Sequence, residues 1–225
     1  MGNQHYTGGT KIKVADLDDG DIMLKFSDDS VLNTFIHAGQ GVFTDSKASA
    51  ITHAGIYAQG YIIEVNGEGL NCDPLDDKDH KDLHYLVMRA VDPNVAHNIG
   101  GLAWQTYNRS GKALEEGKKL TYSKSGAFAS LFRKGNASEK ELIDSIEKEM
   151  GLLYLRQGAS QFCSEFVSIC IQYALKNCEV KLDGSLGKLA KTAQSLTPAN
   201  LTQALLDSKK HFKFWGVLPG GSERQ

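Results

Sequence analysis

The segment from residue 160 to residue 174 places the strongest constraint on the fold. Its apolar residues stand at positions 162, 166, 167, 169, 170, 171, 173 and 174. This spacing follows the period of an α-helix, but it covers most of the helix circumference, whereas a surface helix carries one apolar stripe. We therefore expect a helix that is buried on most of its sides.

Several short apolar segments have the length and composition of β-strands. They are residues 22–26, 52–57, 61–65 and 84–90. Gln59-Gly60 separates the second from the third, which predicts a hairpin with a two-residue turn. Residues 212–218 form a closing apolar segment, and the acidic stretch at 71–82 is interpreted as a loop.

Helical patterns are expected in four further places. They are residues 30–43, 94–108, 138–150 and 198–207. Residues 109–138 are rich in Gly, Ser and Lys and show little periodicity, so they are interpreted as an inserted or mobile segment. We expect a single domain over residues 1–225, because this length suffices for one core.

Charge and composition exclude several classes of protein. The net charge of −2 gives no long-range attraction to nucleic acid or acidic membranes. No run of 18 apolar residues occurs, so no membrane-spanning segment is expected. The first residues lack the basic and apolar pattern of a signal peptide, which favours a cytoplasmic location in the producing cell. The four cysteines are interpreted as mostly free thiols, since a core of this size needs no disulfides.

Cys163 is the strongest candidate for a nucleophile, because the pattern places it in the first turn of the buried helix. Unpaired N–H groups and the helix dipole at such a position lower the pKa of a thiol, and the same N–H groups can stabilise an oxyanion. The alternative is a cysteine that packs as a small apolar residue. That alternative is favoured for Cys170 and Cys178.

His53 is the best candidate base among the seven histidines. If Gln59-Gly60 is a two-residue turn, Gly55 lies opposite Glu64, and His53 lies opposite Asn66. Glu64 is then diagonal to His53 on the same face, where a carboxylate can orient the imidazole. Asn66 is the alternative orienting residue, and a strand histidine with no catalytic role is the alternative for His53.

One group of side chains is a candidate for a metal site. Cys72, His80 and His84 are the residues that could form one, but their spacing matches no zinc pattern. We therefore expect neither a metal nor another cofactor.

Four segments together resemble a known family. They are Gly20-Asp21-Ile22; Thr52-His53-Ala54-Gly55-Ile56-Tyr57 with Ile63-Glu64; Gly151-Leu152-Leu153-Tyr154 with Phe162-Cys163-Ser164-Glu165-Phe166-Val167; and Ser195-Leu196-Thr197-Pro198-Ala199-Asn200-Leu201. Their order is similar to that of the NlpC-type branch of papain-like cysteine hydrolases in its circularly permuted arrangement, the YiiX/YebB-like group. The Cys-Ser-Glu-Phe-Val segment is the most specific of these pieces.

The resemblance implies an α+β, papain-like fold in which an antiparallel sheet packs against the helix that carries the cysteine. It further implies that Cys163 is the nucleophile, His53 the base and Glu64 the residue that orients His53. Tyr154 resembles a tyrosine that lines the site or assists the oxyanion. Residues 109–138 are longer and more polar than a minimal version of the fold requires.

The function that the resemblance implies is a cysteine peptidase or amidase that cleaves amide bonds in peptidoglycan stem peptides. Because no signal peptide is expected, a leaderless route such as type VI secretion would deliver it to a target periplasm as an antibacterial toxin, with an immunity protein as partner. One alternative is a lipid- or protein-directed amidase or acyltransferase with the same site. Another is a non-catalytic binding module, which predicts that Cys163 is buried and not aligned with His53. Neither nucleic-acid binding nor integral membrane association is expected.

Overall fold

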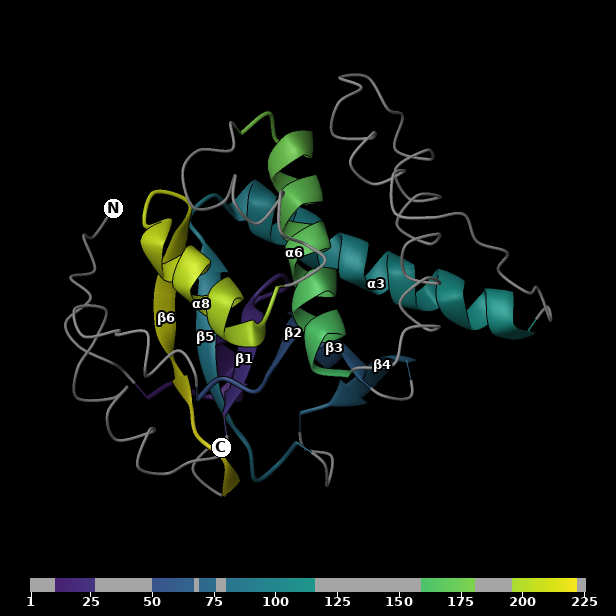
Figure 1. The fold of residues 1–225 in the computed structure, drawn as a ribbon, viewed down its shortest axis with the longest axis horizontal. Coiled ribbons are helices and arrows are strands. Elements are labelled where there is room, and N and C mark those ends of the chain that lie inside the picture. The colour runs from purple at the N-terminus through teal and green to yellow at the C-terminus, as the bar shows by residue number, and fades with distance from the viewer. Residues whose placement is uncertain are drawn as a thin grey trace.

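The computed structural model describes residues 11–26, 50–66, 69–75, 80–115, 159–180 and 196–221. Within these ranges the chain forms an α+β fold with a six-stranded antiparallel sheet and three α-helices, shown in Figure 1. A short 3₁₀-helix, η1 (Val14–Asp16), precedes the sheet. The coarse fold class predicted from the sequence is therefore confirmed.

The strands are arranged in the order β4-β3-β2-β1-β5-β6, and every neighbouring pair is antiparallel. Their bounds are β1 (Ile22–Phe26), β2 (His53–Ala58), β3 (Tyr61–Asn66), β4 (Gly69–Pro74), β5 (His84–Ala90) and β6 (Phe212–Leu218). The strands expected at 22–26 and 84–90 and in the hairpin are confirmed, and the closing apolar segment is an edge strand.

The loop expected at residues 71–82 is wrong over its first part. Residues 71–74 belong to β4, which pairs with β3 from Tyr61↔Pro74 to Asn66↔Gly69. The apolar side chains of Leu70 and Cys72 alternate with polar ones and contact the main core. Acidic composition suggested a loop, whereas the two-residue alternation of a half-covered edge strand decided the structure.

The helices are α3 (Pro93–Glu115), α6 (Ala159–Asn177) and α8 (Pro198–Asp207). Those expected at 160–174 and 198–207 are confirmed. The helix expected at 94–108 is longer than predicted, so residues 109–115 of the predicted insertion are helical. Residues 116–138 lie outside the described residues, as do the helices expected at 30–43 and 138–150.

The main core lies between the sheet and the helices. Residues of α3, α6 and α8 join those of the sheet in a single apolar cluster, and Figure 1 shows α6 and α8 in front of the strands. A smaller cluster covers the opposite face and includes Met23, Ile62 and Tyr85. The predicted burial of α6 is confirmed, since all of its described side chains from Cys163 to Leu175 are buried. Within the described residues, no helix has the length and apolarity needed to cross a bilayer.

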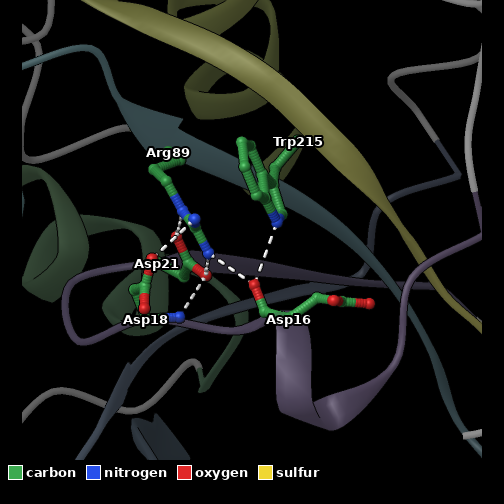
Figure 2. Close-up of polar contacts among 5 residues, drawn as sticks. All are labelled: Asp16, Asp18, Asp21, Arg89 and Trp215. Carbon is green, nitrogen blue, oxygen red and sulfur yellow. Dashed lines mark hydrogen bonds and ion pairs between the residues drawn. The ribbon is translucent and has the colours of Figure 1, made fainter. Parts of the chain in front are cut away.

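A buried arginine secures the turn that leads into β1 (Figure 2). Arg89 on β5 donates two hydrogen bonds to the Asp21 carboxylate, at 2.6 and 2.7 Å, and forms an ion pair with Asp18 at 2.7 Å. Its guanidinium also donates to the Asp16 carbonyl at 2.7 Å and lies 3.7 Å from the centre of the Trp215 ring. This cluster joins the Gly-Asp turn to β5 and β6, so its role is structural.

Gly20 is required where the same turn contacts α3. Its φ of +93° is unfavourable for other residues, and a Cβ would clash with the Ala96 carbonyl oxygen. On the helix side, a Cβ at Gly100 would lie 2.7 Å from the Gly20 nitrogen. The two glycines let the turn lie directly against the helix backbone.

Candidate active site

The β2–β3 hairpin places His53 and Glu64 on one face of the sheet. Gln59 and Gly60 both have positive φ, at 55° and 88°, as in the two-residue turns that match the twist of a hairpin. The strained Gln59 is held by Asp19, which accepts from its backbone nitrogen at 2.7 Å and from its side-chain nitrogen at 2.8 Å. The resulting ladder pairs Gly55 with Glu64, as predicted, but it ends at this pair, so the expected pairing of His53 with Asn66 is wrong.

The predicted diagonal contact is present, because His53 Nε2 lies 3.3 Å from Glu64 Oε2. The absence of a side chain at Gly55 makes this arrangement possible. A Cβ there would lie 2.9 Å from Ile62 Cγ2 and 3.3 Å from Glu64 Cβ. The glycine therefore leaves room for the Glu64 side chain to lean across the strand toward His53.

Cys163 comes to this pair from α6. Its thiol and the His53 imidazole are hydrogen-bonding partners, and the backbone N–H of Ala54 donates to the sulfur. The Ser164 hydroxyl oxygen lies 3.8 Å from the sulfur. Cys163 is fully buried, yet it belongs to neither apolar cluster, whereas Cys170 is part of the main core. Its surroundings are thus polar, unlike those of a cysteine that only fills space.

The thiol lies where β2 and β3 separate. Their pairing ends at Gly55↔Glu64, although β3 continues beside β4 as far as Asn66. In the alternating pattern of this hairpin, the Ala54 N–H points toward β3. Because β3 has left the ladder there, this N–H is available to the sulfur. The opening between the two strands is what allows a residue of α6 to reach His53.

Burial and the neighbouring polar or charged groups shift the pKa values of His53, Cys163 and Glu64 in opposite directions. Burial alone would lower the pKa of His53, but the hydrogen bond to Cys163 and the neighbouring Glu64 carboxylate raise it to about 9. Burial alone would raise the pKa of Cys163, but His53, the Ala54 N–H and Ser164 hold it below its ordinary value. Burial likewise disfavours the Glu64 carboxylate, and His53 nevertheless lowers its pKa. These directions favour a thiolate–imidazolium pair at neutral pH.

His53 and Glu64 form a short, buried contact. Both Nε2 and Oε2 are buried, and the two atoms are not aligned as hydrogen-bond donor and acceptor despite their 3.3 Å separation. Hydrogen bonds of catalytic groups are often poorly aligned before substrate binds. Since Nε2 faces Glu64, the other ring nitrogen, Nδ1, is left for the thiol.

The expected place of Cys163 in the first helical turn is wrong. Helix α6 begins at Ala159, which makes Cys163 its fifth residue. The N–H of a fifth residue bonds to the carbonyl of the first, so it is not one of the free donors at the helix N-terminus. The apolar period shows which residues of a helix are buried but does not mark its first turn. The pKa of Cys163 is therefore lowered by its hydrogen bonds with His53, the Ala54 N–H and Ser164 and by the charge of His53.

Tyr154 and Asn66 are the other residues that the sequence predicts in the site. Tyr154 lies outside the described residues. Asn66 pairs with Gly69 on β4, and the contact to His53 is made by Glu64. Sequence reasoning missed Lys25, which lies directly opposite His53 across the β1–β2 ladder. No turn joins these two strands directly, so no local signal indicates their register.

His80 and His84, two of the candidate metal ligands, have other partners. His80 is buried, with Nδ1 at 2.8 Å from the Tyr85 hydroxyl and Nε2 at 3.7 Å from an Asp73 carboxylate oxygen. His84 Nδ1 accepts a hydrogen bond from the Gly220 N–H at 2.8 Å. In the part of the chain that the structure describes, no group of three or more His, Cys, Asp and Glu side chains is arranged to hold a metal ion.

A pocket of about 660 Å³ lies at the far end of α6. It is lined by Val91, Asp92, Val95, Leu175, Glu179, Val180, Lys210 and His211. Cys163 and Leu175 are twelve positions apart on one helix, which separates them by about 18 Å along its axis. This pocket is therefore not part of the Cys163 site.

Comparisons with protein-family models, curated proteins and solved structures found no match to this chain.

Proposed function

We propose that this protein is a cysteine hydrolase of the permuted papain-like type that cleaves amide bonds, with Cys163 as nucleophile. The observation that carries the proposal is the position of His53, which contacts both Cys163 and Glu64. A nucleophile, a base and an orienting carboxylate in contact form the unit that activates a thiol. The order of the four sequence segments that resemble the NlpC-type branch supports the same function.

Acylation begins from the thiolate–imidazolium pair. The Cys163 sulfur attacks the amide carbonyl carbon and forms a C–S bond, while the carbonyl oxygen takes up negative charge. The imidazolium of His53 then donates its proton to the amide nitrogen, and the C–N bond breaks. The amine leaves, and the acyl group remains on Cys163 as a thioester.

In deacylation the same groups take part, and His53 now acts as a base. Neutral His53 accepts a proton from water, and the resulting hydroxide adds to the thioester carbonyl carbon. The C–S bond breaks, a carboxylic acid is released, and the Cys163 thiolate again faces an imidazolium. Glu64, which contacts Nε2, keeps the ring oriented and stabilises its charged form in both steps.

The substrate class in this proposal is the stem peptide of peptidoglycan, which follows from the resemblance to NlpC-type hydrolases. Delivery by a secretion machine such as type VI, action as an antibacterial toxin and pairing with an immunity protein belong to the same proposal. The low net charge of −2 is compatible with a small diffusing enzyme. None of these points depends on a bound cofactor.

The burial of Cys163 also bears on the binding-module alternative. That alternative predicts a buried cysteine that is not aligned with His53. Cys163 is buried, but it is a hydrogen-bonding partner of His53. A binding module has no need of a thiol with a lowered pKa, so this contact favours catalysis. His53, 13% exposed, is the more open member of the pair, so substrate would approach from the imidazole side.

The experiment is digestion of purified peptidoglycan with the wild-type protein and with Cys163→Ala, followed by mass spectrometry of the released fragments. Cys178→Ala is the matched control, because it removes a half-buried thiol near the far end of α6. Fragments that appear with the wild type and with Cys178→Ala, but not with Cys163→Ala, would support the proposal. Fragments that persist with Cys163→Ala would overturn the assignment of the nucleophile.

A further measurement, the rate at which Cys163 is alkylated, separates a wrong substrate from a wrong nucleophile. If no fragment appears but Cys163 is alkylated rapidly at neutral pH, peptidoglycan is the wrong substrate while the activated thiol stands. Lipid and protein acyl substrates would then be tested. If Cys163 reacts no faster than an ordinary thiol, the catalytic role itself fails.

A further inference from the structure

Lys25 stands beside the candidate site on the neighbouring strand. It lies directly opposite His53 in the antiparallel β1–β2 ladder. Directly paired residues have their Cβ atoms about 5 Å apart and project from the same face. The Lys25 side chain therefore shares a face with His53 and, through the β2–β3 register, with Glu64.

The ammonium group of Lys25 has no fixed partner among the described residues. It forms no ion pair and no side-chain hydrogen bond with any of them. Arg89 on β5 is the contrasting case, because its guanidinium is held by Asp21 and Asp18. Lys25 is half-buried, so its side chain is partly ordered while its charge remains available.

In the described part of the chain, the partly exposed charged side chains that adjoin Cys163 and Glu64 are cationic. The Glu64 carboxylate is nearly covered, with 6% of its side chain exposed, and the Cys163 sulfur is fully buried. Among the described residues, His53 and Lys25 retain exposure beside these two groups, whereas the Asp73 carboxylate, 42% exposed, lies farther along the same face and pairs with His80. An incoming substrate thus meets two cationic groups before it reaches either anion. A substrate with a negative group near the scissile bond is favoured by this arrangement.

We propose that Lys25 is a specificity-determining residue that binds a carboxylate of the substrate within about one residue of the scissile amide. The distance follows from the cross-strand pairing with His53, since a lysine side chain and a peptide unit both extend only a few ångströms. This inference rests on the proposed function, because it assigns the substrate chemistry of the Cys163 site. A neutral acyl chain of the same shape would be a poorer substrate.

Support of the Glu64 carboxylate is a second role for Lys25, and it predicts a different result from substrate binding. Its charge helps to lower the pKa of Glu64, although burial and His53 have larger effects on that group. If Lys25 acted only through Glu64 and His53, its removal would change the reactivity of Cys163 toward all reagents alike. If Lys25 binds carboxylates, its removal would affect anionic reagents selectively.

The test compares the rates at which Cys163 is alkylated by iodoacetate, an anion, and by iodoacetamide, its neutral analogue. The proteins are the wild type, Lys25→Gln, Lys25→Arg and Lys210→Gln, each with the background of Cys163→Ser subtracted. Lys210→Gln removes the same charge at the far end of α6. We expect the iodoacetate-to-iodoacetamide ratio to fall about three- to fivefold in Lys25→Gln, the effect of one partly exposed charge. It should stay near wild type in the other two variants.

The two alkylation rates distinguish the carboxylate site from the other roles of Lys25. An unchanged ratio in Lys25→Gln, with both rates reduced together, would overturn the carboxylate site and leave Lys25 as a support of Glu64. An equal fall in Lys210→Gln would also overturn it, since the effect would then be one of net charge. If Cys163 in the wild type reacts with neither reagent faster than an ordinary thiol, the proposed function fails instead.

Turnover provides the second arm of the test. Stem peptides with a free carboxylate next to the scissile amide are compared with the same peptides amidated at that carboxylate. Lys25→Gln should raise KM for the free form about three- to fivefold and leave KM for the amidated form unchanged. Equal changes for both forms would contradict the proposal, whereas no hydrolysis of either form by the wild type would contradict the proposed function.

Discussion

Gly55 lies directly opposite Glu64 in the β2–β3 ladder, and a Cβ on residue 55 would come within 3.3 Å of the Glu64 Cβ. The same missing side chain leaves space in which the Glu64 carboxylate approaches the His53 imidazole. The orientation of His53 therefore depends on a position that has no functional group of its own.

Replacing Gly55 by alanine should displace Glu64 and reduce activity. The added Cβ would lie 2.9 Å from Ile62 Cγ2, so that side chain or the strand must shift. We expect kcat/KM to fall about tenfold, because misplacement of a catalytic group by a fraction of an ångström is costly. Steady-state kinetics with a peptide substrate would measure this. Gly101→Ala on α3 is the control, since its Cβ would meet open space and its φ is not in the left-handed region.

The wild-type protein should hydrolyse its amide substrate across neutral pH and lose this activity as the pH passes about 9. The pKa of the Cys163 thiol is held below its ordinary value by its hydrogen bonds and by His53, and His53 keeps its proton until its own pKa of about 9 is exceeded. Acylation needs both the thiolate and the imidazolium, so the profile of kcat/KM should be bell-shaped and report the pKa values of the coupled pair. A rate that kept rising above pH 9 would contradict the acid role of His53.

Replacing Glu64 by glutamine should move the alkaline limb of that profile to lower pH. The Glu64 carboxylate raises the pKa of His53, so its removal lets burial lower that pKa. We expect a milder loss of kcat/KM than in His53→Ala, because the thiol still has its base. The pH profile of Glu64→Gln, measured beside the wild type, checks the direction. An unshifted limb would show that Glu64 does not influence the imidazole.

Removal of Cys163 should abolish turnover and leave the fold intact. Loss of a nucleophile costs several orders of magnitude in kcat. Cys170 provides an internal contrast, since it lies in the main core and burial raises the pKa of its thiol. Cys170→Ala should retain activity and lose about 1 kcal/mol of stability, as expected when a small buried side chain is truncated. Activity assays and urea denaturation of both variants would distinguish the two roles.

Replacing Arg89 by alanine should destabilise the protein strongly. The change would leave the fully buried Asp21 carboxylate without its main cationic partner. Removal of one member of a buried ion pair costs about 3–5 kcal/mol. Lys213→Ala is the control, because Lys213 lies 4.8 Å from the centre of the same Trp215 ring, is partly exposed and should cost less than about 1 kcal/mol. Urea denaturation would provide both free energies of unfolding.

Local rules in the sequence determined much of the site's framework. The two-residue turn at Gln59-Gly60 set the register of the hairpin, and the register placed Glu64 diagonal to His53. The apolar period of residues 160–174 identified the buried helix that carries Cys163. These predictions succeeded because turn chemistry and side-chain periodicity act over a few neighbouring residues.

Only the tertiary structure decided how these pieces meet. His53 and Cys163 are 110 positions apart, and their contact depends on α6 packing at the opening between β2 and β3, where the Ala54 N–H has no strand partner. The place of Lys25 beside His53 and the ion pairs of Arg89 with Asp18 and Asp21 likewise come from strands that no short turn connects. Such contacts arise from the packing of the whole core, which the local periodicity of a sequence does not encode.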